Sequence, residues 1–359
     1  MQLIIGAYTE DLPYAEGRAA GILSAEFDTA SGHIGRVTML AETRNPSYLA
    51  VTASGDRVYA VNETFAFEDR EGGGLTAFAR DRRTGELTTL NARPSLGMSP
   101  CHLVVGGAGR FVLAANYGVD AGSVVAYRLE PDGSLGARTG RVTLIGCGPD
   151  ESRQSASHAH MVASDPANGD ILVADLGSDK ILAFRLGADG GLSPKGGSEL
   201  EERPGAGPRH FAFHPDGDHL FVVNELDSSL SVLRRKGDRF ESVGCASTVP
   251  PGGAEGNLAG AVRVSPSGRH VLISNRGHDS LAVFRFDAAA SRFALVGIID
   301  SVAACPRDLV FSPDGRYVIV VGQGNDLVAS YAFDDNAGAL RFVQSTTAPT
   351  PTCLVLVQP

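Results

Sequence analysis

Tryptophan is absent from this chain of 359 residues, and lysine and arginine nowhere form a long run. The formal net charge is −10, so a nucleic acid or an anionic membrane would meet no basic surface. We therefore expect neither as a partner, and a site for an anionic ligand has to be a local basic patch. No segment approaches the ~20 apolar residues of a transmembrane helix. The first residues also lack the basic start and long apolar run of a secretory signal, which predicts a cytoplasmic protein.

Cysteine is scarce and has no spacing typical of a metal or redox site. The five cysteines are Cys101, Cys147, Cys245, Cys305 and Cys353. An odd number without a CxxC pair does not indicate a disulfide framework. We expect free thiols in a reducing compartment.

Helical periodicity is nearly absent, and a repeated β-hairpin pattern takes its place. Each unit has an apolar run, a turn with glycine, and a second run of β-branched or aromatic residues. The units span residues 45–63, 99–117, 157–176, 207–225, 258–276 and 305–323. A third short strand follows each unit, as in SLSVLRR (229–235), and a fourth weaker one, as in FESVGCAS (240–247). The repeat therefore predicts four antiparallel strands per unit.

A seventh unit is divided between the two ends of the chain. TPTCLVLV (350–357) begins a unit, QLIIGAY (2–8) matches a second strand, and GILSAEF (21–27) matches a third. Stacking such units radially buries both faces of each sheet, and closing the ring removes exposed edges. We predict an all-β, seven-bladed β-propeller, a single domain over residues 1–359, closed by pairing of the N- and C-terminal strands.

The repeat also aligns the residues that should surround the mouth of the central channel. At the start of the first strand stand Ser47, Cys101, His160, Arg209, Gly260, Arg307 and Thr352. At the end of the second strand stand Glu63, Tyr117, Leu176, Glu225, Arg276 and Gln323. Convergent polar groups in a concave mouth are the usual form of a small-molecule site.

Several segments resemble one family of propellers. SHAHMVASDP, GPRHFAFHPDG, VNE and SNRGHDSLAVF are similar to the bacterial lactonase propellers, which include cycloisomerase-type 6-phosphogluconolactonases and fungal carboxymuconate-lactonising enzymes. The resemblance runs from IIGAYT to CPRDLVFSPDGRY, nearly the whole chain. It implies active residues at the matching positions His160, Arg209, Glu225 and Arg276.

The residue types suit hydrolysis of a lactone. Arg209, Arg276 and Arg307 can hold an anionic group in bidentate fashion and stabilise an oxyanion. Glu225 is the preferred base and His160 the alternative, since either can take a proton from water. Arg209 and Glu225 should form a cross-strand pair, which by itself could be an ordinary ion pair worth about 0–1 kcal/mol.

Further residues are assigned to the surroundings of the site. We expect four substrate-binding residues at the channel mouth: Arg307, Glu63, Asn257 and, in a supporting position at the same end, His158. His102 and His210 occur one position after the mouth residues. They should point to the opposite strand face, packed and hydrogen-bonded.

These observations predict hydrolysis of a small anionic sugar lactone, with 6-phosphogluconolactone as the first candidate substrate. Two alternatives stay open: a cycloisomerase that closes a carboxymuconate-type diacid to a lactone, and a non-catalytic scaffold. Guanidinium groups oppose a bound cation, so we expect no metal at the mouth and no cofactor. We expect a monomer or a weak homo-oligomer.

Overall fold

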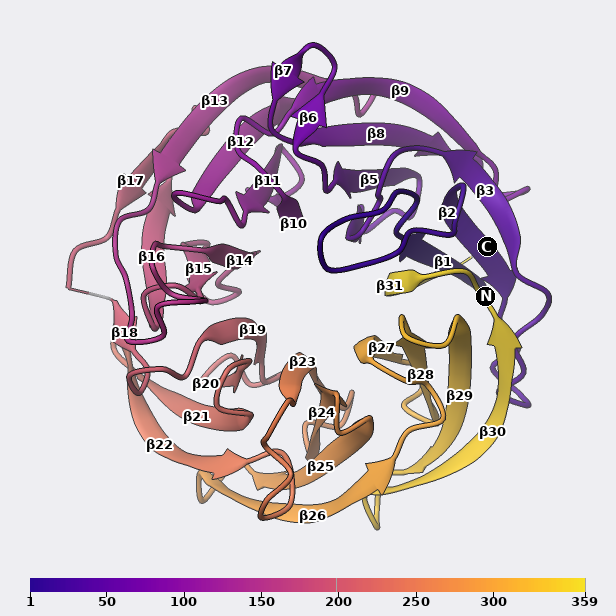
Figure 1. Cartoon of the computed structure of the whole chain (residues 1–359), viewed down its shortest axis with the longest axis vertical. Helices are drawn as coiled ribbons and strands as arrows, with labels where there is room; N and C mark the ends of the chain where they lie inside the picture. Colours follow the sequence, from indigo (N-terminus) through magenta and orange to yellow (C-terminus); the bar gives the residue numbers. More distant parts are fainter. Residues whose placement is uncertain (198, 359) are drawn as a thin grey trace.

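The protein is a ring of seven β-sheets around a central axis (Figure 1). The computed structural model describes residues 1–197 and 199–358, and none of these residues is in a helix. It follows that no helix in the described part could cross a membrane. The seven sheets confirm the predicted all-β, seven-bladed propeller.

Each blade runs from an innermost strand at the axis to an outermost strand at the rim. The innermost strands are β4 (Leu49–Val51), β10 (Pro100–Gly106), β14 (Ala159–Ser164), β19 (Pro208–Phe213), β23 (Leu258–Val264), β27 (Pro306–Phe311) and β31 (Pro351–Val357). The second strands are β1 (Gln2–Ala7), β5 (Arg57–Asn62), β11 (Phe111–Asn116), β15 (Ile171–Asp175), β20 (His219–Asn224), β24 (His270–Arg276) and β28 (Tyr317–Gly322).

The third and outermost strands complete the blades. The third strands are β2 (Gly21–Glu26), β8 (Gly74–Arg80), β12 (Ser123–Leu129), β16 (Lys180–Leu186), β21 (Ser229–Lys236), β25 (Ser280–Asp287) and β29 (Leu327–Asp334). The outermost strands are β3 (Thr38–Glu42), β9 (Leu87–Pro94), β13 (Leu135–Thr143), β17 (Leu192–Pro194) with β18 (Leu200–Glu201), β22 (Arg239–Ser247), β26 (Arg292–Asp300) and β30 (Ala339–Thr347). A small hairpin, β6 (Ala66–Phe67) and β7 (Arg70–Glu71), stands apart from the blades.

The two ends of the chain close the ring in one blade, as predicted. Its strand order is β3-β2-β1-β31, so three strands come from the N-terminus and one from the C-terminus. Strand β1 pairs antiparallel with β31 from Gln2↔Val357 to Gly6↔Cys353. This pairing covers backbone edges that would otherwise be exposed.

The hydrophobic core lies between the blades, in seven clusters that each join two neighbouring sheets. Strand β1 shows how one strand serves two clusters. Leu3 and Ile5 pack against the preceding blade, and Ile4 packs against the following one. Because successive side chains alternate across a strand, a run of consecutive apolar residues buries both faces of the sheet.

An irregularity in pairing occurs at the mouth end of most inner strands. In β19, Pro208 pairs with Asn224 and His210 with Val223, so Arg209 has no partner in the ladder. The same shift leaves out one residue in β10, β14, β27 and β31 and two in β23. Such bulges bend a strand and re-aim its side chains. The omitted residues include Cys101, His160, Arg209 and Arg307, the positions that the repeat had aligned at the mouth.

Candidate active site

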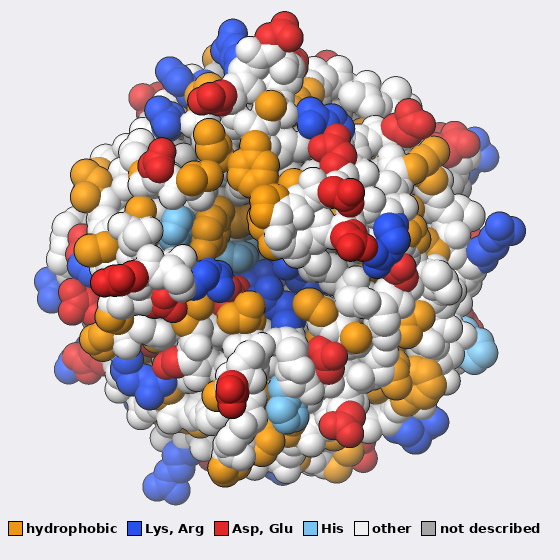
Figure 2. All heavy atoms as spheres, in the orientation of Figure 1, with side chains coloured by type: hydrophobic (Ala, Val, Ile, Leu, Met, Phe, Trp, Pro, Cys, Tyr) orange, Lys and Arg blue, Asp and Glu red, His pale blue; other side chains and the backbone are white. Residues whose placement is uncertain are grey.

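A cavity of about 750 Å³ opens at the mouth of the central channel. Seen from the side drawn in Figure 2, the molecule is hollowed near its centre, with arginine and histidine side chains inside the hollow. The residues that line it include six with ionisable side chains: Glu63, Arg153, His160, Glu225, Arg276 and Arg307. Five of these six are residues that the repeat placed at the mouth.

Glu225, at the end of β20, is the centre of the charged cluster. Its carboxylate lies 3.0 Å from Arg209 Nε and 2.5 Å from a terminal nitrogen of both Arg276 and Arg153. Burial by itself would raise the pKa of Glu225. The charges of Arg276, Arg209 and Arg153 outweigh burial and hold that pKa well below its usual range. The carboxylate is therefore ionised at neutral pH and has both oxygens engaged.

Arg209 lies beneath the cavity rather than in its wall. The side chain is buried, and its guanidinium donates to the Gly260 carbonyl at 2.8 Å as well as to Glu225. Burial, together with the charges of Arg276 and Arg307, lowers the pKa of Arg209 to about 9, so the group is still charged at neutral pH. The expected Arg209–Glu225 pair is present, and it forms the base of a larger cluster.

Arg153 belongs to the site although sequence reasoning did not include it. It lies between β13 and β14, outside the aligned strand ends. The neighbouring Gln154 is buried and donates to the Leu176 carbonyl at 2.9 Å and to Asp179 at 2.7 Å, which anchors the loop. Nothing in the repeat marks this position, so only the folded loop brings the guanidinium to Glu225.

His160 supplies a neutral imidazole at the same wall. Burial lowers the pKa of His160 well below its usual range, and the charge of Arg209 lowers it further despite the opposing effect of Glu225. Its Nδ1 atom is buried without a hydrogen-bond partner in the described part of the chain. The ring meets those of Tyr117 and His210 edge to face. A deprotonated nitrogen is therefore present beside the cavity at neutral pH.

Hydroxyl groups surround the second carboxylate, Glu63, on another side of the mouth. It accepts hydrogen bonds from Tyr14 at 2.6 Å, from Tyr8 at 3.1 Å and from Ser47. Arg307 in turn donates to the Tyr8 hydroxyl at 2.9 Å. Tyr8 and Tyr14 both lie in the segment that follows β1, and sequence reasoning did not include them. The mouth thus has a cationic side around Glu225 and a hydroxyl-rich side around Glu63.

Two expected substrate-binding residues do not reach the cavity. His158 stacks on Tyr117, with ring centroids 4.3 Å apart, and its Nδ1 lies 3.0 Å from the Tyr117 carbonyl. Asn257 donates to Ser228 at 2.8 Å and accepts from the His278 backbone at 3.2 Å. Both side chains are engaged by neighbouring residues and neither lines the cavity, so their role in substrate binding stays a prediction.

The prediction that His102 and His210 point to the opposite face of their strands, away from the mouth residues, was wrong. Strands β10 and β19 are in different, non-adjacent blades, yet the centroids of the two imidazole rings lie 5.4 Å apart, so the rings meet across the channel. The Tyr48 ring packs on the His102 ring, with centroids 4.0 Å apart. Both nitrogens of His102 are buried without a partner among the described residues. The bulge after the first residue of each strand turns these imidazoles inward, which an uninterrupted alternation does not predict.

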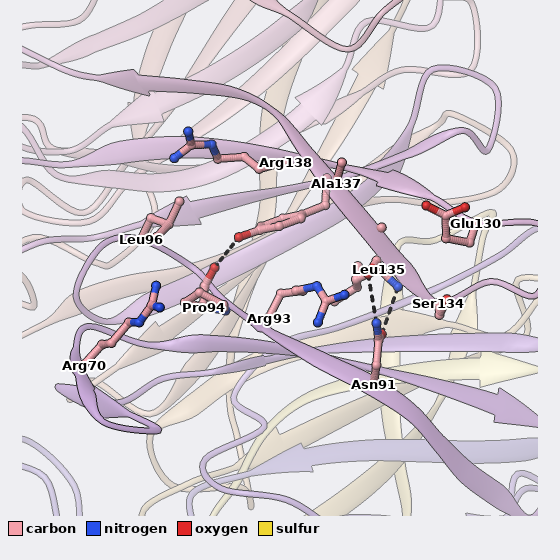
Figure 3. Close-up of a pocket in the computed structure, with 12 residues that line it drawn as sticks. Arg70, Asn91, Arg93, Pro94, Leu96, Glu130, Ser134, Leu135, Ala137 and Arg138 are labelled. Atoms are coloured by element: carbon pink, nitrogen blue, oxygen red, sulfur yellow. Dashed lines mark hydrogen bonds between the residues drawn. The ribbon is translucent and has the colours of Figure 1, made fainter.

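A second hollow, of about 640 Å³, lies at the rim between the outer strands β9 and β13 (Figure 3). Its wall includes Arg70, Arg93 and Arg138. The Asn91 side chain bonds both backbone groups of Leu135 and joins the two blades. No histidine lines this hollow in the described chain, so it lacks the neutral base found at the mouth.

Comparison with known proteins relates the chain to lactonase propellers. A family model described as "Lactonase, 7-bladed beta-propeller" matches residues 2–356. The chain is 32% identical over 345 residues to a 6-phosphogluconolactonase of Bacillus subtilis, covering 95% of both chains. A solved Pseudomonas aeruginosa periplasmic gluconolactonase has a TM-score of 0.90 and 29% identity, over 100% of this chain and 99% of that one. A putative 6-phosphogluconolactonase from Bacteroides fragilis has a TM-score of 0.90 and 26% identity, over 99% and 97%.

Proposed function

The chain belongs to the lactonase family of seven-bladed β-propellers and is a lactone hydrolase, and on that premise we propose that its substrate is an anionic sugar lactone, 6-phosphogluconolactone first. The observation that carries this proposal is the cluster around Glu225. Three guanidiniums, of Arg153, Arg209 and Arg276, surround one carboxylate, which leaves an excess of two positive charges beside the cavity.

That excess charge suits an anionic group on the substrate. Arg153 and Arg276 line the cavity, and each engages Glu225 through one terminal nitrogen. A guanidinium has five N–H donors, so donors remain for a phosphate or carboxylate. Arg209 is buried beneath them and does not contact the substrate. Its proposed role is to position Glu225 and to make the pocket more positive.

Two observations favour His160 over Glu225 as the base. Three guanidiniums engage both oxygens of Glu225, so neither oxygen is free to take a proton from water. His160 is neutral at neutral pH because burial and Arg209 lower its pKa. A base has to be within reach of water in the cavity and unprotonated, and His160 meets both conditions. Glu225 then holds the arginines in place.

The proposed reaction uses these groups in sequence. His160 takes a proton from water while the water oxygen bonds to the lactone carbonyl carbon. Arg276 stabilises the negative charge that develops on the carbonyl oxygen. The bond from that carbon to the ring oxygen then breaks, and the proton from His160 passes to the leaving oxygen. The product is one open chain with a hydroxyl and a carboxylic acid, and the acid releases its proton to solvent to become a carboxylate.

On the other side of the mouth, Glu63, Tyr8 and Tyr14 suit the hydroxyl groups of a sugar. Glu63 accepts three hydroxyl hydrogen bonds within the protein, so sugar hydroxyls can replace or extend contacts of the same kind. A muconate-type diacid has no such hydroxyls. This side of the cavity therefore favours a sugar lactone over a diacid.

A substrate panel on the purified protein tests the proposal. We expect 6-phosphogluconolactone to be hydrolysed with the highest kcat/KM, measured above its spontaneous hydrolysis, and unphosphorylated gluconolactone to be a poorer substrate. A preference for gluconolactone, the substrate class named for the Pseudomonas relative, would contradict the role of the cationic side. Lactonisation of carboxymuconate without hydrolysis of either sugar lactone would contradict the proposal as a whole.

A further inference from the structure

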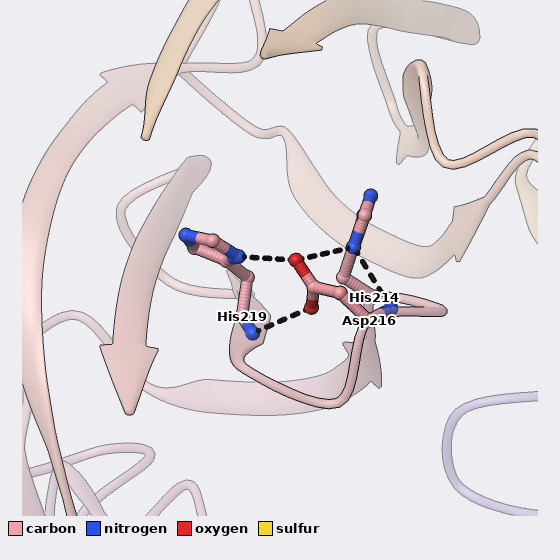
Figure 4. Close-up of side chains that lie close together, drawn as sticks. All are labelled: His214, Asp216 and His219. Carbon is pink, nitrogen blue, oxygen red and sulfur yellow. Dashed lines mark hydrogen bonds and ion pairs between the residues drawn. The ribbon is translucent and has the colours of Figure 1, made fainter. Parts of the chain in front are cut away.

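A cluster of two histidines and an aspartate lies at the opposite end of the strands from the mouth. His214 and Asp216 lie in the turn between β19 and β20, and His219 is the first residue of β20 (Figure 4). One potential ligand atom from each residue lies within 4.8 Å of those of the other two. In the described chain no other group of three such residues is this close. Both imidazoles are buried, while Asp216 is exposed to water.

The outer nitrogens of both rings are held by the neighbouring blade. His214 Nε2 lies 3.1 Å from the Gly268 carbonyl, and His219 Nε2 lies 2.9 Å from the Ser291 hydroxyl. A carbonyl only accepts, so His214 Nε2 carries the hydrogen and, in the neutral ring, Nδ1 carries a lone pair. The Asp216 backbone N–H, 3.1 Å from that Nδ1, agrees with this tautomer.

The inner nitrogens converge on a single oxygen. Asp216 Oδ2 lies 2.9 Å from His214 Nδ1 and 2.8 Å from His219 Nδ1. His219 can donate to this oxygen. Neutral His214 has no hydrogen at Nδ1, whose lone pair accepts the Asp216 backbone N–H, so the 2.9 Å approach of Nδ1 to the carboxylate oxygen is repulsive, and a cation between the two atoms would relieve it. Histidines that ligate metals characteristically donate their other ring nitrogen to a carbonyl or similar group, as His214 does here.

We propose that His214, Asp216 and His219 bind a divalent first-row metal ion of the zinc class, with water completing the coordination. Two imidazole nitrogens and one carboxylate oxygen are ligands that Zn²⁺ accepts, at about 2.0–2.2 Å. Tetrahedral angles then require ligand atoms about 3.3 Å apart. Asp216 Oδ2 lies closer than this to both nitrogens, at 2.9 and 2.8 Å, so the exposed Asp216 has to move outward to admit the ion.

The ion would tie two blades together and take no part in hydrolysis. Its ligands come from the β19–β20 turn and the first residue of β20, and their supporting contacts come from turns of the β23–β26 blade. Arg209 and Glu225 occupy the other ends of β19 and β20. We therefore expect bound metal to raise the melting temperature and to leave lactone turnover unchanged.

Asp216→Asn is the decisive variant. Its amide oxygen can keep the backbone contacts that Oδ1 makes to Asp218 and His219, and its NH₂ group can donate to both histidines. The turn should therefore fold without metal. Asp314→Asn is the matched control, because Asp314 occupies the same position in the β27–β28 turn, where Ser312 and Tyr317 replace the histidines.

The experiment measures Zn²⁺ binding to chelator-treated protein by titration calorimetry, Co²⁺ binding by visible absorption, and melting temperature with and without Zn²⁺. We expect one saturable site and a metal-dependent rise in melting temperature in the parent and in Asp314→Asn, and loss of both in Asp216→Asn. Absence of saturable binding in the parent would mean that a proton, not a metal, joins His214 to Asp216. Binding that persists in Asp216→Asn would place the ion elsewhere, and either result overturns the proposal.

Discussion

The guanidinium of Arg153 lies 2.5 Å from the carboxylate of Glu225, although the two residues are 72 positions apart and only Glu225 belongs to the blade repeat. The loop that carries Arg153 is fastened by the buried Gln154. Arg153 is about one third exposed, whereas Glu225 is buried. Arg153 is therefore the arginine of this cluster that a ligand entering from solvent meets most readily.

Arg153→Gln should separate phosphorylated from unphosphorylated lactones. A hydrogen bond to a charged group is worth about 1.5–3 kcal/mol, and ~1.4 kcal/mol corresponds to a factor of ten. We expect KM for 6-phosphogluconolactone to rise roughly 10–100-fold, with kcat and the constants for gluconolactone little changed. Steady-state kinetics on both substrates is the measurement. Arg138→Gln, at the rim hollow, is the control and should behave as the parent. An equal loss on both substrates would show that Arg153 does not bind the phosphate.

Glu225→Gln should lower both the stability of the protein and the rate of lactone hydrolysis. The substitution leaves three guanidiniums around a neutral amide, and breaking a buried ion pair costs about 3–5 kcal/mol. We expect a lower free energy of unfolding and a lower kcat, measured by urea unfolding and steady-state kinetics. Glu241→Gln, an exposed carboxylate paired with Lys236, should change neither. A loss of turnover with unchanged stability would instead identify Glu225 as the base.

The pH dependence of kcat/KM should report a histidine with a lowered pKa. Burial and Arg209 hold the pKa of His160 well below 6.5. The neutral base is the active form, so activity should stay level as the pH falls from about 8 through 6.5. It should decline only at lower pH, as His160 takes up a proton. His160→Gln should reduce kcat by roughly 10²–10⁴-fold. An acid limb at or above pH 6.5, or a variant with near-parent turnover, would exclude His160 as the base.

Stability should fall on acidification because three buried histidines resist protonation. Burial lowers the pKa values of His102, His160 and His210 well below 6.5. Below pH ~6.5 the unfolded chain binds these protons and the folded chain does not, so the folded state loses stability as pH falls toward the lowered values. The slope can reach about 4 kcal/mol per pH unit for three protons. Urea unfolding between pH 8 and 5 measures it.

His102→Gln should reduce that slope by about one third, because one of the three protons is removed. His33→Gln is the control, since His33 is exposed. Equal slopes in the parent and His102→Gln would show that His102 is not held neutral in the folded protein.

Removal of Leu354–Pro359 should open the ring. The truncation deletes most of β31, exposes the edge of β1 and removes Leu354 from the cluster between the closing blade and its neighbour. We expect a markedly lower melting temperature and aggregation, measured by thermal unfolding and size-exclusion chromatography. Retention of full stability and a single monodisperse species would mean that the ring does not depend on this closure.

The repeat, the number of blades and the closure of the ring could all be predicted from the sequence. Apolar runs, glycine turns and strand lengths are local properties, and a seventh unit divided between residues 2–27 and 350–357 has few ways to complete a blade. The same alignment brought His160, Glu225, Arg276 and Arg307 to the mouth, because strand ends of equivalent blades meet at one face.

The tertiary structure decided which way side chains near the mouth point and which further residues belong to the site. The bulges in β10 and β19 turn His102 and His210 into the channel, and a bulge has no signature in the alternation of side chains. Arg153 reaches Glu225 from a loop with no counterpart in the repeat, whereas His158 and Asn257 are withdrawn by contacts with Tyr117 and Ser228. A side chain's role at the mouth depends on contacts between blades, and such contacts exist only in the folded chain.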